Sequence, residues 1–312
     1  MSIINIENKG AVLCSYKCDG GGNQSGKKIA EMLNYKFYDL NTEEWKTCKE
    51  KKQIWYMNDD IYKLNGKDRE EFEAVLKYAD DIKVVLNFVI GGTDKEKWLI
   101  KYPVKKIIFL NRGRVDEWKK KVQNSPQKLI EVDNILPPIN LELFDGTKRD
   151  KDKIQIGRHS RIYGKYPDNP TEMYEKLDND ERDFHFMLAH PKIAKEFKDN
   201  ESFHFYKWSE LPVHEFLAKM DIYLAIINPK TKEQAGRSNM EAMAAGCCVI
   251  TEDRDGPVDY IKHGETGFLV KSQEEAMALV RTLSKKEIRR IGNNARKYAL
   301  ENFGAKKWVD II

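Results

Sequence analysis

Short apolar runs alternate along the chain with longer stretches in which apolar residues recur every three or four positions. In the first half, apolar runs predict strands at 10–16, 36–40, 54–57, 82–90 and 106–110, and helical spacing predicts helices at 27–33, 69–78 and 115–122. In the second half, strands are expected at 153–157, 184–188, 203–206, 222–227, 247–251 and 268–270, and helices at 170–177, 213–219, 237–245, 273–283 and 285–303. Alternating strands and helices are typical of parallel sheets covered by helices, so the pattern predicts an α/β fold.

A segment of different texture separates the two series. Residues 135–141 contain two prolines, and residues 144–153 contain a glycine and a run of charged side chains. Such a composition is typical of linkers. We therefore expect two Rossmann-like domains, over residues 1–146 and 147–312, with a cleft between them in which a ligand binds. A length of 312 residues suits two domains.

The composition narrows the class of protein. With 41% hydrophobic and 33% charged residues, the chain is too apolar for a disordered protein and suits a soluble globular one. Its longest apolar runs, such as 222–227, are far shorter than the roughly 20 residues of a membrane-spanning helix. No secretory signal is visible, and the cysteines show no C-x-x-C spacing, so we expect reduced thiols and a cytoplasmic location. The cysteines are Cys14, Cys18, Cys48, Cys247 and Cys248.

The net charge of +4 is too small to indicate a nucleic-acid partner, but its distribution is uneven. The segment 101–128 holds the basic residues Lys101, Lys105, Lys106, Arg112, Arg114, Lys119, Lys120, Lys121 and Lys128, against only Asp116 and Glu117. One interpretation is an ordinary solvated helix face. The other is a surface for an anionic acceptor, a nucleic acid or the periphery of a membrane.

A glycine-rich stretch follows the first predicted strand, as in nucleotide-binding folds. Gly21 and Gly22 would let the backbone approach the phosphate of a bound nucleotide. The stretch from Gly21 to Lys28 nearly spells a P-loop, G-x-x-x-x-G-K-[ST]. Its last position is lysine, which offers no hydroxyl to magnesium, and no clear Walker-B acid follows a strand. A P-loop nucleotidase nevertheless stays open as an alternative.

Two glutamates eight positions apart carry the strongest signal. Glu233 precedes a glycine turn, and Glu241 lies inside a helix expected to begin near Arg237. The N-terminus of that helix presents backbone N–H groups, which suit a phosphate. Glu233 would then reach sugar hydroxyls from the loop, and Glu241 would accept from a ribose hydroxyl.

This stretch resembles the E-x7-E signature of family-4 retaining glycosyltransferases, which have the two-Rossmann GT-B architecture. The likeness continues through 255–259 and 263–270. The segment 156–161 with Lys165 resembles the family's G-R-x-S…K phosphate clamp, with a longer spacing, and 135–144 resembles its interdomain segment. The resemblance covers about 130–312 well.

The resemblance implies a hexosyltransferase that uses a nucleoside diphosphate sugar, expected to be a UDP-hexose, without a metal or cofactor. It implies that Arg158 and Lys165 hold the diphosphate, with Arg161 as a partial substitute for the usual spacing. Its donor contacts include backbone amides, here at Gly236, Arg237 and Ser238. The base is expected to lie near the loop from Tyr206 to Trp208, with Trp208 at the donor. The final helix, about 296–312, would cross back to the N-terminal domain.

Several features leave alternatives open. Asp253-Arg254-Asp255 imitates the D-x-D metal site of other glycosyltransferases, but it lies in a glycine-proline loop and is interpreted as part of that loop. All histidines, at 159, 185, 190, 204, 214 and 263, follow the linker, whereas many relatives place one in the N-terminal domain. His185, His190 and His204, which lie near strands, are expected to be structural. A GT-B-fold sugar-nucleotide epimerase and a nucleotide-binding protein without turnover also stay open, and the acceptor is unidentified.

Overall fold

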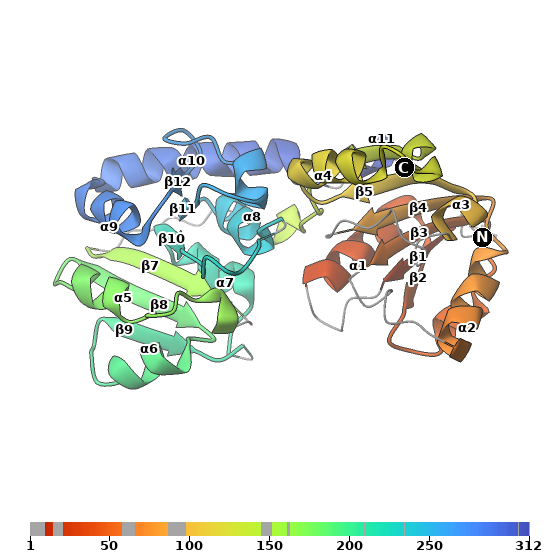
Figure 1. Ribbon diagram of the computed structural model, residues 1–312. Coiled ribbons are helices and arrows are strands. Elements are labelled where there is room, and N and C mark those ends of the chain that lie inside the picture. Colours follow the sequence, from red (N-terminus) through yellow and green to blue (C-terminus); the bar gives the residue numbers. More distant parts are fainter. Residues whose placement is uncertain are drawn as a thin grey trace, which may run out of the picture. The chain divides into compact units, whose positions relative to one another are not determined.

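The computed structural model describes residues 10–14, 21–57, 66–86, 98–144, 152–160, 163–208, 210–233, 235–304 and 306–311. The chain divides into two compact units, one of Met1–Ile139 with Ala305–Ile312 and one of Asn140–Gly304. The sequence placed the boundary after residue 146, whereas the division falls after Ile139. Each unit is built on a parallel six-stranded sheet with helices, as the α/β pattern predicted (Figure 1).

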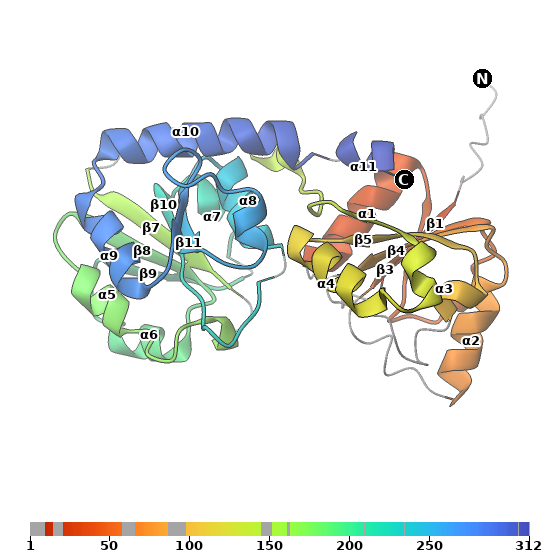
Figure 2. The ribbon, with the colours of Figure 1, turned by 45° about the horizontal axis from the view of Figure 1, so that its top comes forward.

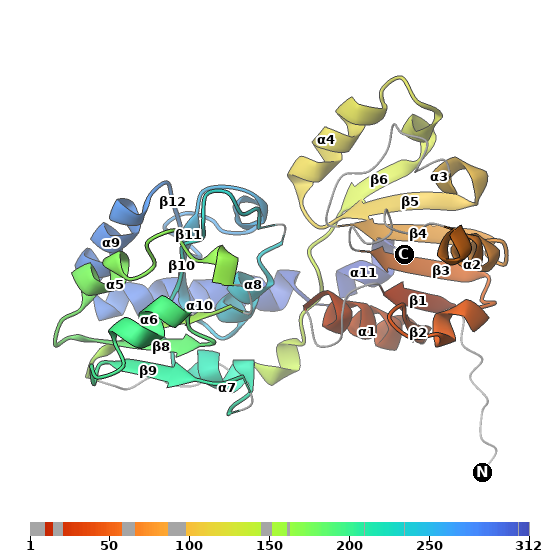
Figure 3. The same cartoon turned by 60° about the horizontal axis from the view of Figure 1, so that its bottom comes forward.

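Unit 1 holds the first sheet, in the order β2-β1-β3-β4-β5-β6, which Figure 3 shows strand beside strand. Its strands are β1 (Ala11–Cys14), β2 (Lys36–Asp39), β3 (Lys52–Met57), β4 (Asp81–Leu86), β5 (Val104–Phe109) and β6 (Glu131–Asn134). Its helices are α1 (Gly21–Leu33), α2 (Gly66–Leu76), α3 (Trp98–Lys101), α4 (Arg112–Val122) and α11 (Lys306–Ile311), with 3-10 turns at Glu44–Thr47 and Pro126–Leu129. The sequence missed α3, β6 and both turns, because each is short and lacks a clear period.

Aromatic side chains fill the core of unit 1. Trp55 on β3 is fully buried, and its ring meets Phe72 of α2 edge to face at 4.9 Å. On α4, Val115, Trp118 and Val122 share one face through their spacing of three and four residues, and all three are buried. Lys119, Lys120 and Lys121, which lie between Trp118 and Val122 in the sequence, are exposed.

Helix α1 begins at Gly21, six residues before the predicted start at Lys27. The glycines suggested a loop because glycine is a poor helix former. Packing explains the difference, since a Cβ on Gly26 would lie 3.2 Å from the Cys14 sulfur on β1. The helix therefore approaches the strand closely, and the P-loop-like stretch is helical from its first glycine rather than a phosphate loop.

Helix α11 belongs to unit 1 although it ends the chain. Trp308 is fully buried, its indole N–H donates to the Leu136 carbonyl at 2.9 Å, and its ring centroid lies 6.5 Å from that of Tyr56. The sequence predicted one final helix over about 296–312. In the structure α10 ends at Asn302 and α11 is a separate helix.

Unit 2 holds the second sheet, in the order β12-β11-β10-β7-β8-β9. Its strands are β7 (Ile154–His159), β8 (Arg182–Met187), β9 (Phe203–Tyr206), β10 (Ile222–Ala225), β11 (Cys248–Glu252) and β12 (Phe268–Val270). Its helices are α5 (Glu172–Leu177), α6 (Pro191–Glu196), α7 (Val213–Ala218), α8 (Arg237–Ala244), α9 (Gln273–Thr282) and α10 (Lys285–Asn302), the last a long helix along the unit (Figure 2). Counted in chain order within the unit, this is the 3-2-1-4-5-6 order of the Rossmann fold.

The described cysteines, at 14, 48, 247 and 248, are buried and unbridged. No helix in the described part of the chain is both long enough and apolar enough to cross a membrane.

Candidate functional site

The strand order of unit 2 reverses between β7 and β10, which pair in parallel although more than sixty residues separate them. Ligands of open α/β sheets bind outside the carboxyl ends of the strands at such a reversal. His159 ends β7, Lys165 lies in the turn Tyr163–Lys165 after it, and Glu233 follows β10. The fold thus brings segments that are distant in sequence to one edge of the sheet.

Lys165 and Glu233 meet at this edge. The ammonium nitrogen of Lys165 lies 2.5 Å from a carboxylate oxygen of Glu233, and the two side chains are 26% and 16% exposed. The Cγ of Glu233 would lie 3.5 Å from a Cβ placed on Gly236, so the carboxylate stands beside the start of α8. A cation and a carboxylate are therefore held together next to a helix N-terminus.

Arg158, predicted to hold the diphosphate, is buried and bonded to backbone carbonyls. It is only 3% exposed, and its guanidinium donates to the carbonyls of Ile226 and Lys165, the latter at 3.2 Å. The guanidinium carbon stacks over the Tyr166 ring, 4.0 Å from its centroid. In this arrangement Arg158 holds the turn that carries Lys165 instead of facing solvent. Its direct contact with a diphosphate remains a prediction.

The loop of Glu233 is fixed by the glycine-proline loop that the sequence singled out. The Glu233 N–H donates to the Asp255 carboxylate at 3.2 Å, and the Gly256 N–H donates to the Glu233 carbonyl at 2.9 Å. Arg254 donates to the carbonyls of Asn228 and Thr231 at 2.9 and 2.7 Å. Asp255 itself has φ +57°, an unfavourable backbone for a non-glycine residue. The carboxylate of Asp255 thus orders the backbone that carries Glu233.

Helix α8 begins as the sequence predicted, and its N-cap Gly236 has φ +65°. A Cβ at this position would lie 2.6 Å from the Tyr260 hydroxyl, which donates to the Gly236 carbonyl at 3.2 Å. Glycine is therefore required for both backbone and space. The N–H groups of Arg237 and Ser238 open the helix, where no intrahelical acceptor exists for them.

Glu241 lies one turn into α8, and its side chain is 13% exposed. Its carboxylate accepts from Arg237 Nε at 2.8 Å and lies 3.6 Å from His159 Nε2. Burial raises the pKa of the Glu241 carboxyl, but Arg237 and His159 together outweigh it, so the net pKa is lowered. His159 was not among the predicted site residues. Its place as the last residue of the strand at the reversal is the signal that could have indicated it.

Four other predicted residues belong to unit 1, to another part of the sheet of unit 2, or to a segment outside the description. Gly21 and Gly22 are the first residues of α1 in unit 1. Arg161 lies outside the described residues. Trp208 follows β9, which is two strands away from β7 in the sheet. Their assignment to the donor stays a prediction.

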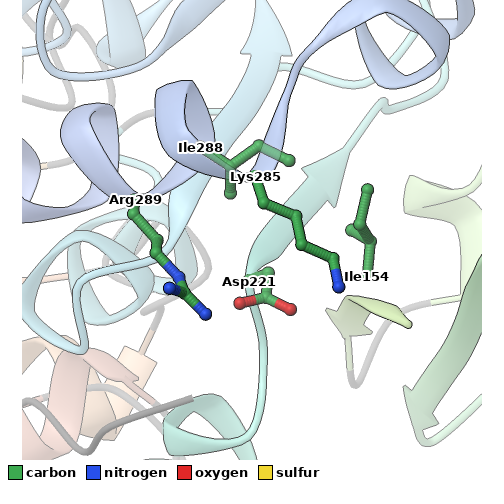
Figure 4. A pocket seen from close by; sticks show the side chains of 5 residues that line it. All are labelled: Ile154, Asp221, Lys285, Ile288 and Arg289. Carbon is green, nitrogen blue, oxygen red and sulfur yellow. The ribbon is translucent and has the colours of Figure 1, made fainter. Parts of the chain in front are cut away.

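A small pocket lies at the opposite edge of the same sheet (Figure 4). Ile154 starts β7 and Asp221 precedes β10, and Lys285 and Arg289 point toward Asp221 from α10. The pocket has room for about one water molecule, so it is too small for a nucleotide.

The comparisons with known proteins agree with this geometry. Residues 187–298 match the family model described as "Glycosyl transferases group 1". This match includes the segments that carry Glu233, α8 and the loop of Asp255. Among curated proteins, none matches the sequence.

Solved structures match over nearly the whole chain. HepE from Anabaena, in complex with UDP and glucose, is 10% identical with a TM-score of 0.71, and the match covers 97% of this chain and 99% of that one. A glycosyltransferase from Rickettsia africae is 14% identical with a TM-score of 0.66, covering 98% of each chain. TarM from S. aureus is 17% identical with a TM-score of 0.60, covering 85% of this chain and 55% of that one. The predicted GT-B architecture is confirmed: the protein has the two-unit GT-B fold, and residues 187–298 of its second unit are similar to glycosyl transferases group 1.

Proposed function

We propose that the protein transfers a hexose, with retention of configuration, from a UDP-hexose to an acceptor. The observation that carries the proposal is the pairing of Lys165 with Glu233 at 2.5 Å beside the N-terminus of α8, at the point where the strand order of the sheet reverses. A nucleoside diphosphate sugar needs both a cation and N–H donors for its phosphates and an acceptor for its sugar hydroxyls. Uridine is supported by HepE, whose structures contain UDP and UDP-glucose.

The residues at this edge act by binding and charge stabilisation. The diphosphate gains negative charge as the glycosidic bond breaks, and Lys165 with the amides of Arg237 and Ser238 stabilises it. Glu233 turns from Lys165 to the sugar hydroxyls, and Glu241 accepts from the ribose. Arg158 keeps the Lys165 turn in place through the Lys165 carbonyl.

Retention needs no dedicated base on the protein. The leaving phosphate accepts the proton of the acceptor hydroxyl on the same face of the sugar, so the protein contributes orientation and electrostatics. We propose that no metal or cofactor takes part, since the fixed cations and amides supply the positive charge.

We also propose that unit 1 meets an anionic acceptor or membrane surface in the cytoplasm. Lys119, Lys120 and Lys121 are exposed at the end of α4, and Leu129 beside Lys128 is 83% exposed. A bilayer surface would interact favourably with both the lysines and the leucine, whereas a soluble polyanion would interact favourably only with the lysines. The buried free cysteines suit a reducing compartment.

A donor screen tests the proposal. UDP-hexoses should raise the melting temperature more than other nucleotide sugars, and UDP should be released in proportion to acceptor added. Turnover should survive excess EDTA. Sugar conversion without an acceptor would indicate an epimerase, binding without turnover a nucleotide-binding protein, and magnesium-dependent ATP hydrolysis a nucleotidase. Each of these results would refute the glycosyltransferase proposal.

A further inference from the structure

A second polar cluster lies in unit 2, on strands β8 and β9. Asp183 and His185 stand two residues apart on β8, so they share one face of the sheet, and His204 of β9 is the register partner of His185. The two imidazole rings stack with centroids 4.5 Å apart. One potential ligand atom from each residue lies within 4.8 Å of the others.

The cluster is separate from the edge of the sheet at which Lys165 and Glu233 meet. β8 and β9 lie on the far side of β7 from β10, so the strand reversal that collects Lys165 and Glu233 is not part of it. The proposed transfer reaction uses none of the three side chains. The sequence indicated structural roles for His185 and His204 because no metal-binding spacing joins them, and only the strand register brings them together.

Gln155 on β7 sets the proton position on His185. The amide nitrogen of Gln155 donates to the Asp183 carboxylate at 3.0 Å and to the Lys153 carbonyl at 3.1 Å. A flipped amide would place its oxygen against these two acceptors, so the orientation is fixed. The amide oxygen then faces His185 Nε2 at 2.7 Å, and this ring nitrogen must carry the proton.

The remaining nitrogen of His185 therefore has a lone pair. His185 Nδ1 lies 3.1 Å from the Tyr206 hydroxyl, which donates to it. A histidine whose second N–H donates to a fixed acceptor is the usual arrangement of a metal ligand, because the acceptor orients the ring and raises its basicity. Gln155 provides this support, and it also holds Asp183.

We propose that Asp183, His185 and His204 bind a divalent transition-metal ion of the Zn²⁺ class, with water completing its coordination. Ligand atoms of tetrahedral zinc lie about 3.3 Å apart, so ligand atoms separated by as much as 4.8 Å must close in by about 1.5 Å. Asp183 and His204 are only partly buried and can turn, and Lys153, which is 42% exposed, can leave the carboxylate of Asp183. His185 binds the ion through Nδ1, so the ion takes the place of the hydrogen bond from the Tyr206 hydroxyl.

Such an ion would join the edge strand β9 to β8. Among the described strands, β9 is the last of this sheet and pairs with β8 alone. Bonds from both strands to one ion would cross-link them. Because the ion would bind the folded state and not the unfolded one, it would stabilise the fold. The inference does not depend on the proposed transfer reaction.

Titration of the full chain with Zn²⁺, in a phosphine reductant that keeps thiols reduced, tests the site. We expect one site in the wild type, and a Kd at least about tenfold higher in His204→Ala and in the nearly isosteric Asp183→Asn. His263→Ala, which removes an exposed histidine outside the cluster, is the matched control and should keep the wild-type Kd. Zn²⁺ should raise the melting temperature of the wild type and of the control but not that of the two cluster variants.

Transfer from the UDP-hexose should be unchanged in His204→Ala, which separates a failure here from a failure of the proposed function. Absence of Zn²⁺ binding in the wild type would overturn the proposal. An equal Kd in wild type and His204→Ala would overturn it too.

Discussion

Removing the carboxylate of Glu233 should have opposite effects on nucleotide binding and on turnover. In the structure the carboxylate of Glu233 forms a salt bridge with the ammonium group of Lys165 at 2.5 Å. A diphosphate must displace this carboxylate before it can use the lysine. In Glu233→Gln the lysine is released from its charged partner in advance, so UDP should bind more tightly, while transfer loses the group that orients the sugar.

The magnitudes follow from the enclosure of the pair. With the side chains 26% and 16% exposed, the interaction lies between a surface ion pair and a buried one. Displacing it should cost about 1 kcal/mol, so the UDP Kd should fall about fivefold in Glu233→Gln. The kcat should fall about 100-fold or more, as for loss of a group acting at the transition state. Lys165→Met should instead raise the UDP Kd by about tenfold or more, because it removes a charged hydrogen bond to the ligand.

Calorimetric titration with UDP and steady-state transfer assays measure these effects. Glu172→Gln on α5 is a matched control, because Glu172 pairs with Lys176 at the same 2.5 Å distance, but both side chains are about half exposed, at 46% and 49%. It should change neither UDP affinity nor kcat. Unchanged UDP affinity and unchanged kcat in Glu233→Gln would refute the assignment of this pair to the donor.

The remaining predictions concern the helix start, pH and the basic surface. Gly236→Ala should lower the free energy of unfolding in urea by about 2 kcal/mol or more, because φ is +65° and the added methyl would lie 2.6 Å from a tyrosine hydroxyl. The control Gly264→Ala, at φ +74° with open space around it, should lower it by only about 1 kcal/mol. The pKa of Glu241 is lowered in the folded state, so the ionised carboxylate stabilises the fold above the ordinary carboxyl pKa. This stabilisation is lost as the pH falls through the folded-state pKa. The unfolding free energy should therefore fall more steeply below about pH 4.3 in the wild type than in Glu241→Gln. Charge reversal at Lys119, Lys120 and Lys121 should raise the acceptor KM and flatten its salt dependence with the donor KM unchanged, and reversal of three exposed lysines of unit 2, at 192, 195 and 198, should not; acceptor kinetics that ignore salt would contradict this prediction.

Local patterns were sufficient for much of the fold and for part of the site. β9 and β12 have the predicted bounds, and α8 begins at Arg237 with Glu233 on the preceding loop, because apolar runs and glycine turns act over a few residues. The start of α1 could not be predicted in this way. Its glycines disfavour a helix locally, and the contact of Gly26 with Cys14 that favours one joins residues from two elements.

The cluster on β8 and β9 lay beyond the sequence for a similar reason. His185 and His204 become neighbours only through the register of two strands, and a connection with its own helix separates these strands in the chain. Gln155 joins them from a third strand. The register between two strands does not correspond to a fixed number of residues between them in the sequence. Composition and motifs therefore indicate only that the histidines lie near strands.

Arg158 shows what the periodicity of a strand adds to a motif-based prediction. Side chains along a strand alternate between the two faces of the sheet, so Arg158 shares a face with Ile154 and Ile156. Both isoleucines belong to the hydrophobic core, and Arg158 is accordingly buried, with its guanidinium over the Tyr166 ring. A buried cation must have its donors satisfied, and carbonyl oxygens of the adjoining loops accept from it. The same bonds fix the turn of Lys165, so the arginine of the clamp can act on the diphosphate through the position of the lysine, without touching it.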